Sequence, residues 1–230
     1  MNPPPSPVVL EYLDLDTPAL ALPTSSLDSE ERKRAARFHF DEDRRRFIHG
    51  RAWLRLRVAE LLGMEPAAVT FTTVGERGKP AVAGTLRTFN LSHSAHHGLL
   101  AVHAGGLPLG VDLEVARPFE RAARIAARHF NAAEAAAVAA APEGPEREAV
   151  FFRTWTRKEA YLKLTGLGLP GGLACVETGT EAAARSLRVP AEHGLASAWV
   201  TSLELPASAP TGLLAALAAP CAVPVDWRRG

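Results

Sequence analysis

The chain has 230 residues, of which 47% are apolar and 22% charged, as in globular proteins that bury a core. A net charge of +1 provides no global attraction to nucleic acid or a membrane surface. The longest apolar run, residues 212–225, is too short for a bilayer and contains two prolines. With no signal-peptide pattern at the start and only Cys175 and Cys221, we expect a cytoplasmic protein without a disulfide framework.

The first hundred residues predict alternating strands and helices. Residues 8–15 alternate weakly, as a strand does. Ser26 or Asp28 is a good N-cap for a helix over residues 29–40, because acidic residues fill its first turn. Apolar residues at near-helical spacing predict a second helix over about residues 41–62, ending at Gly63. We expect further strands at residues 68–74, 88–94 and 97–104, with a glycine turn within residues 75–82.

The second half predicts a strand at residues 108–116, an alanine-rich helical segment at 119–141 and a helix at 146–165. Strands are expected near residues 173–177, 184–189, 196–204 and 212–219. The segments "GLLAVHA" (98–104) and "GLLAALA" (212–218) match closely. Chance similarity of two leucine- and alanine-rich strands explains this match about as well as internal duplication. Duplication predicts an α+β protein of two similar lobes, at residues 1–106 and 107–230.

Two carboxylates stand at i and i+2 in "GVDLE". On a strand, this spacing directs Asp112 and Glu114 to one side and Leu113 to the other. Most such triplets form a solvated strand face. A cation between the two carboxylates would relieve their repulsion, so the triplet is also a candidate metal site.

A helical row in "WTRKEAYLK" combines an indole, a carboxylate and an ammonium group. Trp155, Glu159 and Lys163 lie four residues apart and therefore share one helix face. The pair of charges is either a surface salt bridge or part of a site for a metal ion and a phosphate. If Glu159 joins Asp112 and Glu114, the all-oxygen ligand set suits Mg²⁺ rather than zinc, and Lys163 reaches a substrate phosphate.

Three other features are candidate binding groups. "NLSHS" carries Ser92 and His93, and Lys79 lies on a glycine–proline turn that a ligand can approach closely. Residues 32–57 are rich in arginine and lysine. The plainer interpretation of His93 is a structural histidine, and that of Lys79 is an exposed turn lysine. Residues 32–57 are either a solvated helix face or a site for an anion such as a sugar phosphate.

Taken together, four motifs resemble those of the 4′-phosphopantetheinyl transferase superfamily, in its larger, monomeric, Sfp-type branch. They are "GKP" (78–80), "FNLSHS" (89–94), "GVDLE" (110–114) and "WTRKEAYLK" (155–163), in that order and followed by "GLGL". The resemblance implies two α+β lobes related by a pseudo-twofold axis, with coenzyme A and Mg²⁺ bound between them. It implies transfer of phosphopantetheine to a serine of an apo acyl or peptidyl carrier protein, with release of adenosine 3′,5′-bisphosphate.

The resemblance also assigns roles to residues. It implies metal ligands at Asp112, Glu114 and Glu159. Lys163 matches the pyrophosphate-binding lysine, and we expect it to stabilise the leaving group. Glu159, directly or through a metal-bound water, is the candidate base. The implied coenzyme A contacts are Lys79, Ser92, His93, Arg51 and, at the 3′-phosphate, Arg34.

Two positions depart from the family pattern. Glu31 stands where relatives can carry a basic residue, so the 3′-phosphate contact falls to Arg32, Arg34 or residues 44–46. Glu134, after a longer loop than in the family, resembles a further acidic position near the metal.

Two other functions use the same residues. A Mg²⁺-dependent hydrolase of nucleotide pyrophosphates needs the carboxylates but no carrier protein. A nucleic-acid-binding module would use residues 32–57, would weaken steeply with salt and would not depend on Asp112 or Glu159.

Overall fold

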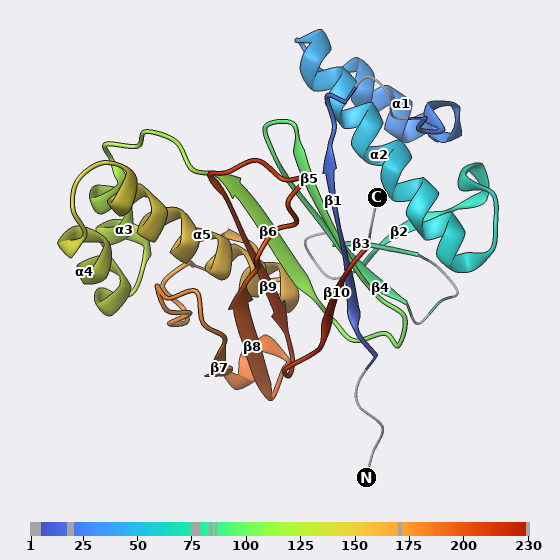
Figure 1. Cartoon of the computed structure of the whole chain (residues 1–230). Helices are drawn as coiled ribbons and strands as arrows, with labels where there is room; N and C mark the ends of the chain where they lie inside the picture. The colour runs from blue at the N-terminus through green and yellow to red at the C-terminus, as the bar shows by residue number, and fades with distance from the viewer. Residues whose placement is uncertain are drawn as a thin grey trace.

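In the computed structural model (Figure 1), residues 6–17, 21–74, 79–82, 85, 87–169 and 172–228 are described. The first sheet has the strand order β10-β1-β5-β4. None of the described helices is long and apolar enough to cross a membrane. The elements of this half are β1 (Val8–Asp14), α1 (Ser29–Ala36), α2 (Asp41–Leu62), the hairpin β2 (Phe71–Val74) and β3 (Lys79–Val82), β4 (Thr88–Ser94) and β5 (His97–His103).

The second sheet has the order β6-β9-β8-β7. In both sheets, the first strand of the half pairs with its last long strand, which pairs with the strand before it: β1-β5-β4 in the first sheet and β6-β9-β8 in the second. In both halves, the long helix follows the first strand in the sequence and precedes that antiparallel pair. This repeat agrees with the expected fold of two similar α+β lobes. The elements are β6 (Gly110–Val115), α3 (Ala122–His129), α4 (Ala132–Ala140), α5 (Pro145–Thr165), β7 (Arg185–Arg188), β8 (Ser197–Ser202), β9 (Leu213–Ala219) and β10 (Val225–Trp227).

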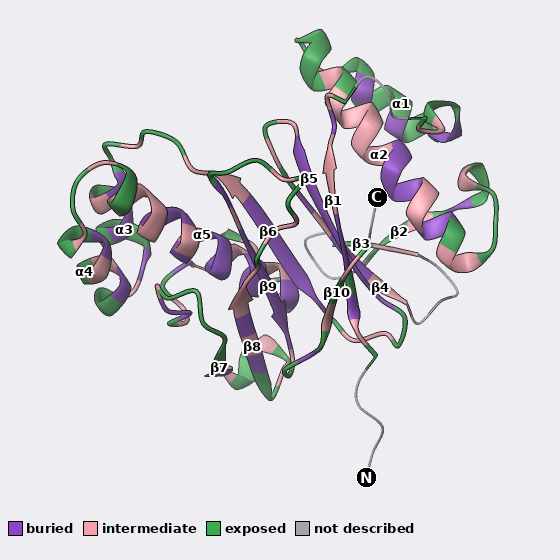
Figure 2. Cartoon of the chain, viewed as in Figure 1, coloured by how far each residue is buried: buried purple, intermediate pink, exposed green. Residues whose placement is uncertain are grey.

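The two similar segments occupy equivalent strands, β5 and β9. Alternate side chains of each strand enter a core shared by the two sheets, and the others face the long helix of their own lobe. Helices α2 and α5 thus cover opposite sides of the molecule, and the buried strands lie between them (Figure 2). The shared core takes Leu99 and Ala101 from β5 and Leu213, Ala215, Leu217 and Ala219 from β9.

We propose that the lobes divide in the loop between β5 and β6, near residue 106. The last strand, β10, does not stay with its own lobe. It pairs in parallel with β1 of the first sheet, with Val8 opposite Val225. The sequence pattern did not predict β10, because three residues are too few to show a period.

Helix ends explain most differences from the predicted elements. Of the two predicted N-caps, Ser26 and Asp28, it is Asp28 that caps α1, in a capping box with Glu31, and α1 ends at Ala36 and not at residue 40. The alanine-rich segment forms two helices, because the Asn131 side chain accepts a hydrogen bond from the Glu134 N–H (3.0 Å) and starts α4. Residues 173–177 are turns and bends, so the strand expected there is wrong.

Glu31 has a structural role that accounts for an acid at this position. It is only 7% exposed and accepts hydrogen bonds from Arg51 Nε (2.6 Å) and Arg55 Nε (2.7 Å) of α2. Its Oε2 also accepts from the Asp28 N–H. The carboxylate therefore holds α1 against α2, and two guanidinium groups balance its charge.

Candidate active site

The two lobes meet where β4 and β6, the edge strands of their sheets, face each other. Alternate residues of β4 bridge this gap with side-chain hydrogen bonds to β6. Asn90 Oδ1 accepts from the Val111 N–H (2.8 Å), Ser92 Oγ donates to Asp112 Oδ1 (2.8 Å), and Ser94 Oγ donates to Glu114 Oε2 (2.7 Å).

Asp112 and Glu114 leave β6 on the same side, as the spacing predicts, and Leu113 is buried in the core shared by the sheets. Lys163 of α5 reaches the same place. Its Nζ donates to Asp112 Oδ1 (2.8 Å), to Ser92 Oγ (2.8 Å) and to the Val111 carbonyl (3.0 Å). The ammonium group thus joins both lobes and one carboxylate.

A glycine permits this approach of α5 to β6. A Cβ atom on Gly110 would lie 2.0 Å from the Ala160 carbonyl oxygen and 2.5 Å from the Leu164 nitrogen. Both are backbone atoms, which cannot move aside as a flexible side chain can. Only glycine therefore lets the helix lie against the first residue of β6, two positions before Asp112.

Glu159 lies near enough for the charges of Asp112 and Glu114 to act on it, although among the described residues the oxygens of the three acids do not all lie within 4.8 Å of one another. Burial, and then the negative charges of Asp112 and Glu114, raise its pKa to about 7, and Lys163 offsets this only in part. The pKa of Glu114 is also raised, first by burial. Among the described residues, Asp112 Oδ2 is buried and has no hydrogen-bond partner. An unpartnered carboxylate oxygen between two acids that resist ionisation fits a divalent cation with oxygen ligands.

We expect metal-free Glu159→Gln protein to be more stable than wild type at pH 8 but not at pH 5. A folded-state pKa raised from 4.5 to about 7 means that folding favours the protonated acid. Wild-type stability therefore falls as pH rises from about 4.5 through 7, by on the order of 2 kcal/mol, while glutamine is unaffected. Thermal unfolding with a chelator at both pH values measures this difference.

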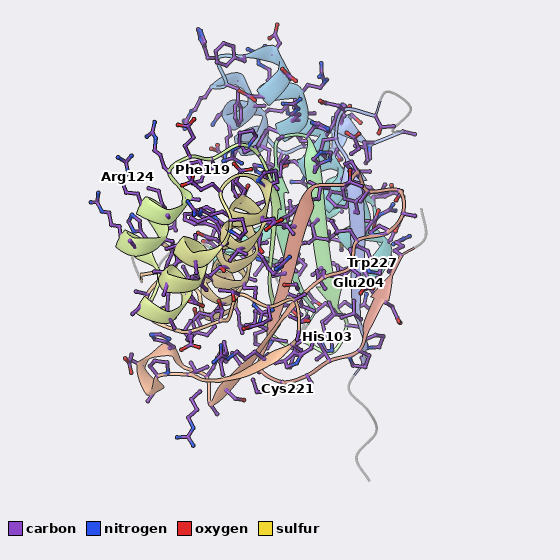
Figure 3. All side chains as sticks on the ribbon, turned by 60° about the vertical axis from the view of Figure 1, so that its left-hand side comes forward. His103, Phe119, Arg124, Glu204, Cys221 and Trp227 are labelled. Carbon is purple, nitrogen blue, oxygen red and sulfur yellow. The ribbon has the colours of Figure 1, made fainter. Side chains whose placement is uncertain are left out.

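The control for this change is Glu204→Gln, at an exposed site on the loop after β8 (Figure 3). It should unfold like wild type at both pH values. Equal stability of Glu159→Gln and wild type at pH 8 would mean that folding does not raise the pKa of Glu159.

A cavity of about 520 Å³ adjoins this cluster in the first lobe. Its polar lining includes three predicted coenzyme A contacts, Arg34, Arg51 and His93. Arg34 is exposed, with its guanidinium 5.2 Å from the centre of the Phe47 ring. The apolar lining of the cavity includes Leu15, Phe38, Phe47, Trp53, Leu54, Pro80 and Phe89.

His93 connects the cavity to the acidic cluster. It follows Ser92 on β4 and keeps an exposed edge, but the cavity walls still desolvate it. This desolvation, and then the positive charges of Lys163 and Arg34, lower the pKa of His93. The imidazole is therefore a neutral hydrogen-bonding group between two cations, which suits contact with an anionic ligand.

The other basic residues that we expect near coenzyme A differ in whether acidic side chains already bind them. Lys79 begins β3 opposite Val74, but its side chain lies outside the described residues, so its predicted role stays a prediction. Arg45 and Arg46 both bond Asp16, and Arg44 pairs with Asp41. Arg32 lines a different hollow, beside Arg44 and His49. Of the alternatives for the 3′-phosphate, Arg34 and Arg46 line the cavity with His93, and Arg46 is paired with Asp16 and Glu42.

Glu134 does not join the acidic cluster, so its resemblance to a metal-site residue does not hold. It is 2% exposed, and its Oε1 accepts hydrogen bonds from the Thr178 N–H (2.7 Å), the Thr178 hydroxyl (3.0 Å) and the Gly179 N–H (3.0 Å). Its other oxygen lies 2.6 Å from Lys158 Nζ, which is also buried. With both oxygens engaged, Glu134 has a structural role.

We expect Glu134→Ala to destabilise the protein by about 3 to 5 kcal/mol, because it leaves the Lys158 charge buried without its partner. Glu143→Ala is the control. It removes an ion pair with Arg147 in which the acid is 87% exposed, and such pairs contribute about 0 to 1 kcal/mol. Urea unfolding of the two variants tests this. A similar loss for both would show that the buried pair is not specially stabilising.

Sequence reasoning missed Asn90 and Ser94 as parts of the site. Their signal was visible, because Asn90, Ser92 and Ser94 follow the period of two that puts them on one face of a strand. It also missed the apolar wall of the cavity, formed by residues such as Phe38 and Phe47, because a local pattern does not distinguish a cavity wall from core.

Three carboxylates beside a lysine are a combination with which proteins hold Mg²⁺ and a substrate phosphate. The fold and the site thus define a class, two-lobed α+β enzymes that act on phosphorylated substrates. Comparison with known proteins narrows this class. Residues 108–218 match the profile of the 4′-phosphopantetheinyl transferase superfamily, and residues 17–105 match that of the 4′-phosphopantetheinyl transferase N-terminal family. The chain belongs to the 4′-phosphopantetheinyl transferase superfamily.

Individual relatives belong to the same superfamily. The chain is 41% identical over 170 residues to the 4′-phosphopantetheinyl transferase HetI of Nostoc sp. PCC 7120, covering 70% of each. It is 38% identical over 146 residues to the transferase psf-1 of Bacillus pumilus, covering 63% of this chain and 60% of the relative. Over another 146-residue match it is 29% identical to Sfp of Bacillus subtilis, covering 63% of this chain and 62% of Sfp.

Proposed function

We propose that this enzyme transfers the 4′-phosphopantetheine arm of coenzyme A to a serine of an apo acyl or peptidyl carrier protein and releases adenosine 3′,5′-bisphosphate. The observation that carries the proposal is the contact of Lys163 with both Ser92 and Asp112, beside a cavity lined by Arg34 and His93. Family membership supports the transferase class.

In this proposal, the cavity binds the nucleotide part of coenzyme A. Arg34 contacts the 3′-phosphate, and His93 and Arg51 contact the remaining phosphates or sugar. Arg51 is held in place by Glu31 and by the Phe71 ring, 4.5 Å from its guanidinium. These contacts fix the pyrophosphate next to Lys163, so the reacting phosphorus is held in one orientation toward the incoming serine.

Asp112, Glu114 and Glu159 would hold Mg²⁺, which supplies charge neutralisation for the pyrophosphate when bound. Glu159, directly or through a water, is the candidate acceptor of the serine proton. Lys163 donates hydrogen bonds to the departing bisphosphate, where negative charge increases as the bond breaks.

The decisive experiment mixes the protein with an apo carrier protein, coenzyme A and Mg²⁺ and measures carrier mass. We expect a phosphopantetheine adduct on the carrier and its absence when the acceptor serine is replaced by alanine. Free phosphopantetheine with an unmodified carrier would instead indicate the Mg²⁺-dependent pyrophosphate hydrolase.

The nucleic-acid-binding alternative keeps only part of its basic stretch, residues 32–57. All six arginines of residues 44–57 form ion pairs with acids, whereas Arg32, Arg34 and Arg37 are exposed at α1, so less positive charge remains for a phosphate backbone. The pairs are Arg44–Asp41, Arg45–Asp16, Arg46–Asp16, Arg51–Glu31, Arg55–Glu31 and Arg57–Glu11.

The same pairing limits electrostatic steering of an acidic carrier protein. We expect the apparent Michaelis constant for the carrier to rise only modestly from low to physiological salt. Arg37, exposed at the end of α1 and close in sequence to the cavity residue Arg34, is the cation we choose to test this. Arg37→Glu should raise the Michaelis constant at low salt, and Arg188→Glu on β7 should not. Equal effects of the two changes would exclude docking near α1.

We also propose a cytoplasmic location, where coenzyme A and apo carrier proteins are available to such an enzyme. Both cysteines are free, which fits a reducing compartment. Cys221 is exposed on the turn after β9 (Figure 3). The mass assay, repeated with carrier proteins from different biosynthetic pathways, would identify the pathway that this enzyme serves.

A further inference from the structure

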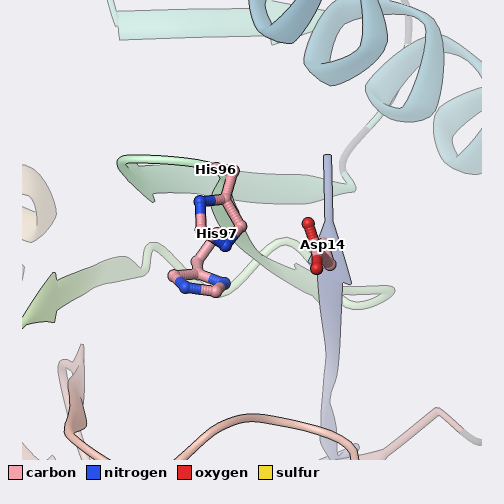
Figure 4. A group of neighbouring side chains, drawn as sticks. All are labelled: Asp14, His96 and His97. Atoms are coloured by element: carbon pink, nitrogen blue, oxygen red, sulfur yellow. The ribbon is translucent and has the colours of Figure 1, made fainter. Parts of the chain in front are cut away.

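A second group of metal-binding side chains lies where the end of β1 meets the turn between β4 and β5 (Figure 4). One ligand atom from each of Asp14, His96 and His97 lies within 4.8 Å of the other two. Asp14 is the cross-strand partner of His97, and His96 is the preceding residue in the turn. The grouping therefore follows from the register of β1 and β5.

We propose that Asp14, His96 and His97 form a binding site for a divalent transition-metal ion of the zinc class. Two imidazoles and one carboxylate are a ligand set that suits Zn²⁺, Co²⁺ or Ni²⁺ and leaves a position for water. The acidic cluster at Asp112 differs in kind, because its oxygen ligands suit Mg²⁺. This site goes beyond the proposed transfer reaction and requires no part of it.

The groups around these ligands fix their orientation. The Tyr12 hydroxyl lies 2.8 Å from His97 Nδ1, and the two rings stack with their centres 5.9 Å apart. When Nδ1–H donates to the phenol oxygen, Nε2 keeps its lone pair for a cation, as in other histidine metal sites. The Asp16 N–H donates to Asp14 Oδ1 (2.9 Å), which holds the carboxylate in place.

Burial and charge also favour a bound cation. His97 is 6% exposed, whereas Asp14 and His96 are half-buried, so the site is open on one side. Burial lowers the pKa of His97, which favours the neutral ring that binds metals. Arg45 and Arg46 are positive charges nearby, and both are already engaged by Asp16, which also lies 3.9 Å from His96 Nδ1.

The proposed site adjoins the active-site strand. Ala95, between Ser94 and His96, has a φ of +52°, a conformation that residues with a side chain rarely adopt. Ser94 itself bonds Glu114 of the acidic cluster. A metal ion on His96 and His97 would therefore hold this turn against β1 at the edge of the active site.

The test measures Zn²⁺ binding by competition with a chromophoric chelator. The Asp112→Ala chain is used, so that the acidic cluster does not contribute. We expect one Zn²⁺ per chain. Tyr12→Phe added to this chain should weaken binding about 10- to 100-fold, and His96→Gln at least as much. His129→Gln, at an exposed histidine of α3, should change nothing.

No bound Zn²⁺, or equal affinity with and without His96→Gln, would overturn the proposal. Because His96 is half-exposed, its replacement should not affect folding, and circular dichroism checks this. The wild-type chain in excess Mg²⁺ provides a second background that keeps Asp112. As an independent readout, Zn²⁺ should raise the Tm of the Asp112→Ala chain and not that of its His96→Gln derivative.

Discussion

Asp112→Ala should abolish transfer to the carrier protein while the chain still folds. Asp112 contacts Ser92 of the first lobe and Lys163 of α5, and its Oδ2 has no hydrogen-bond partner among the described residues and is open to a cation. Removing it takes away a proposed metal ligand and the partner that holds the Lys163 ammonium. We therefore expect no measurable product at Mg²⁺ concentrations that saturate the wild type.

The effect of Asp112→Ala on stability should be small, since two changes oppose each other. The loss of the ion pair with Lys163 destabilises, and the loss of repulsion with Glu159 stabilises. Asp112→Asn keeps the shape and the contact with Ser92 but not the charge, so it should also be inactive. Asp226→Ala, at an exposed site of β10, is the control. Near wild-type turnover of Asp112→Asn at limiting Mg²⁺ would remove Asp112 from the proposed metal site.

Lys163→Ala should lower kcat by about 100- to 1000-fold, or about 2.7 to 4 kcal/mol, with a smaller effect on coenzyme A binding. In the proposal, Lys163 contacts the pyrophosphate, where charge increases in the transition state, while the cavity residues Arg34 and His93 supply ground-state affinity. An interaction that strengthens in the transition state affects kcat rather than binding. Lys163→Arg should restore activity only in part, because a planar guanidinium does not reproduce a compact ammonium.

Isothermal titration of coenzyme A and steady-state transfer, run on the same Lys163→Ala preparation, separate the two effects. Lys33→Ala, at an exposed lysine of α1 that pairs with Glu30, is the matched control and should leave both unchanged. A Lys163→Ala enzyme that reaches the wild-type rate at saturating coenzyme A would make Lys163 a binding residue only.

Local spacing was sufficient to predict the parts of the site that depend on one element. The i, i+2 spacing placed Asp112 and Glu114 on one side of β6, and the i, i+4 spacing placed Glu159 and Lys163 on one face of α5. The order of most strands and helices followed from periodicity and turn residues in the same way, with β10, the break between α3 and α4 and the absent strand at 173–177 as the exceptions. The matching segments of β5 and β9 indicated the two lobes.

Contacts between distant elements could not be predicted from spacing. The sequence shows Glu31 only as an acid where relatives can carry a base, and Glu134 only as a possible acid near the metal. Their ion pairs with Arg55 and Lys158 show that both are structural. The meeting of β4 and β6 as sheet edges also depends on the whole topology. The proximity of Asp14 to His97 depends on the register of β1, which no local pattern sets.

The close contact at Gly110 has a consequence for protein design. The close approach of α5 to β6, which brings the Lys163 ammonium within reach of the Asp112 carboxylate, depends on the absence of a side chain at Gly110 beside the Ala160 carbonyl. Grafting the carboxylates and the lysine onto another α+β scaffold would therefore not reproduce the site. The transplant would need a helix that lies directly on a glycine of the strand, with both backbones fixed in that contact.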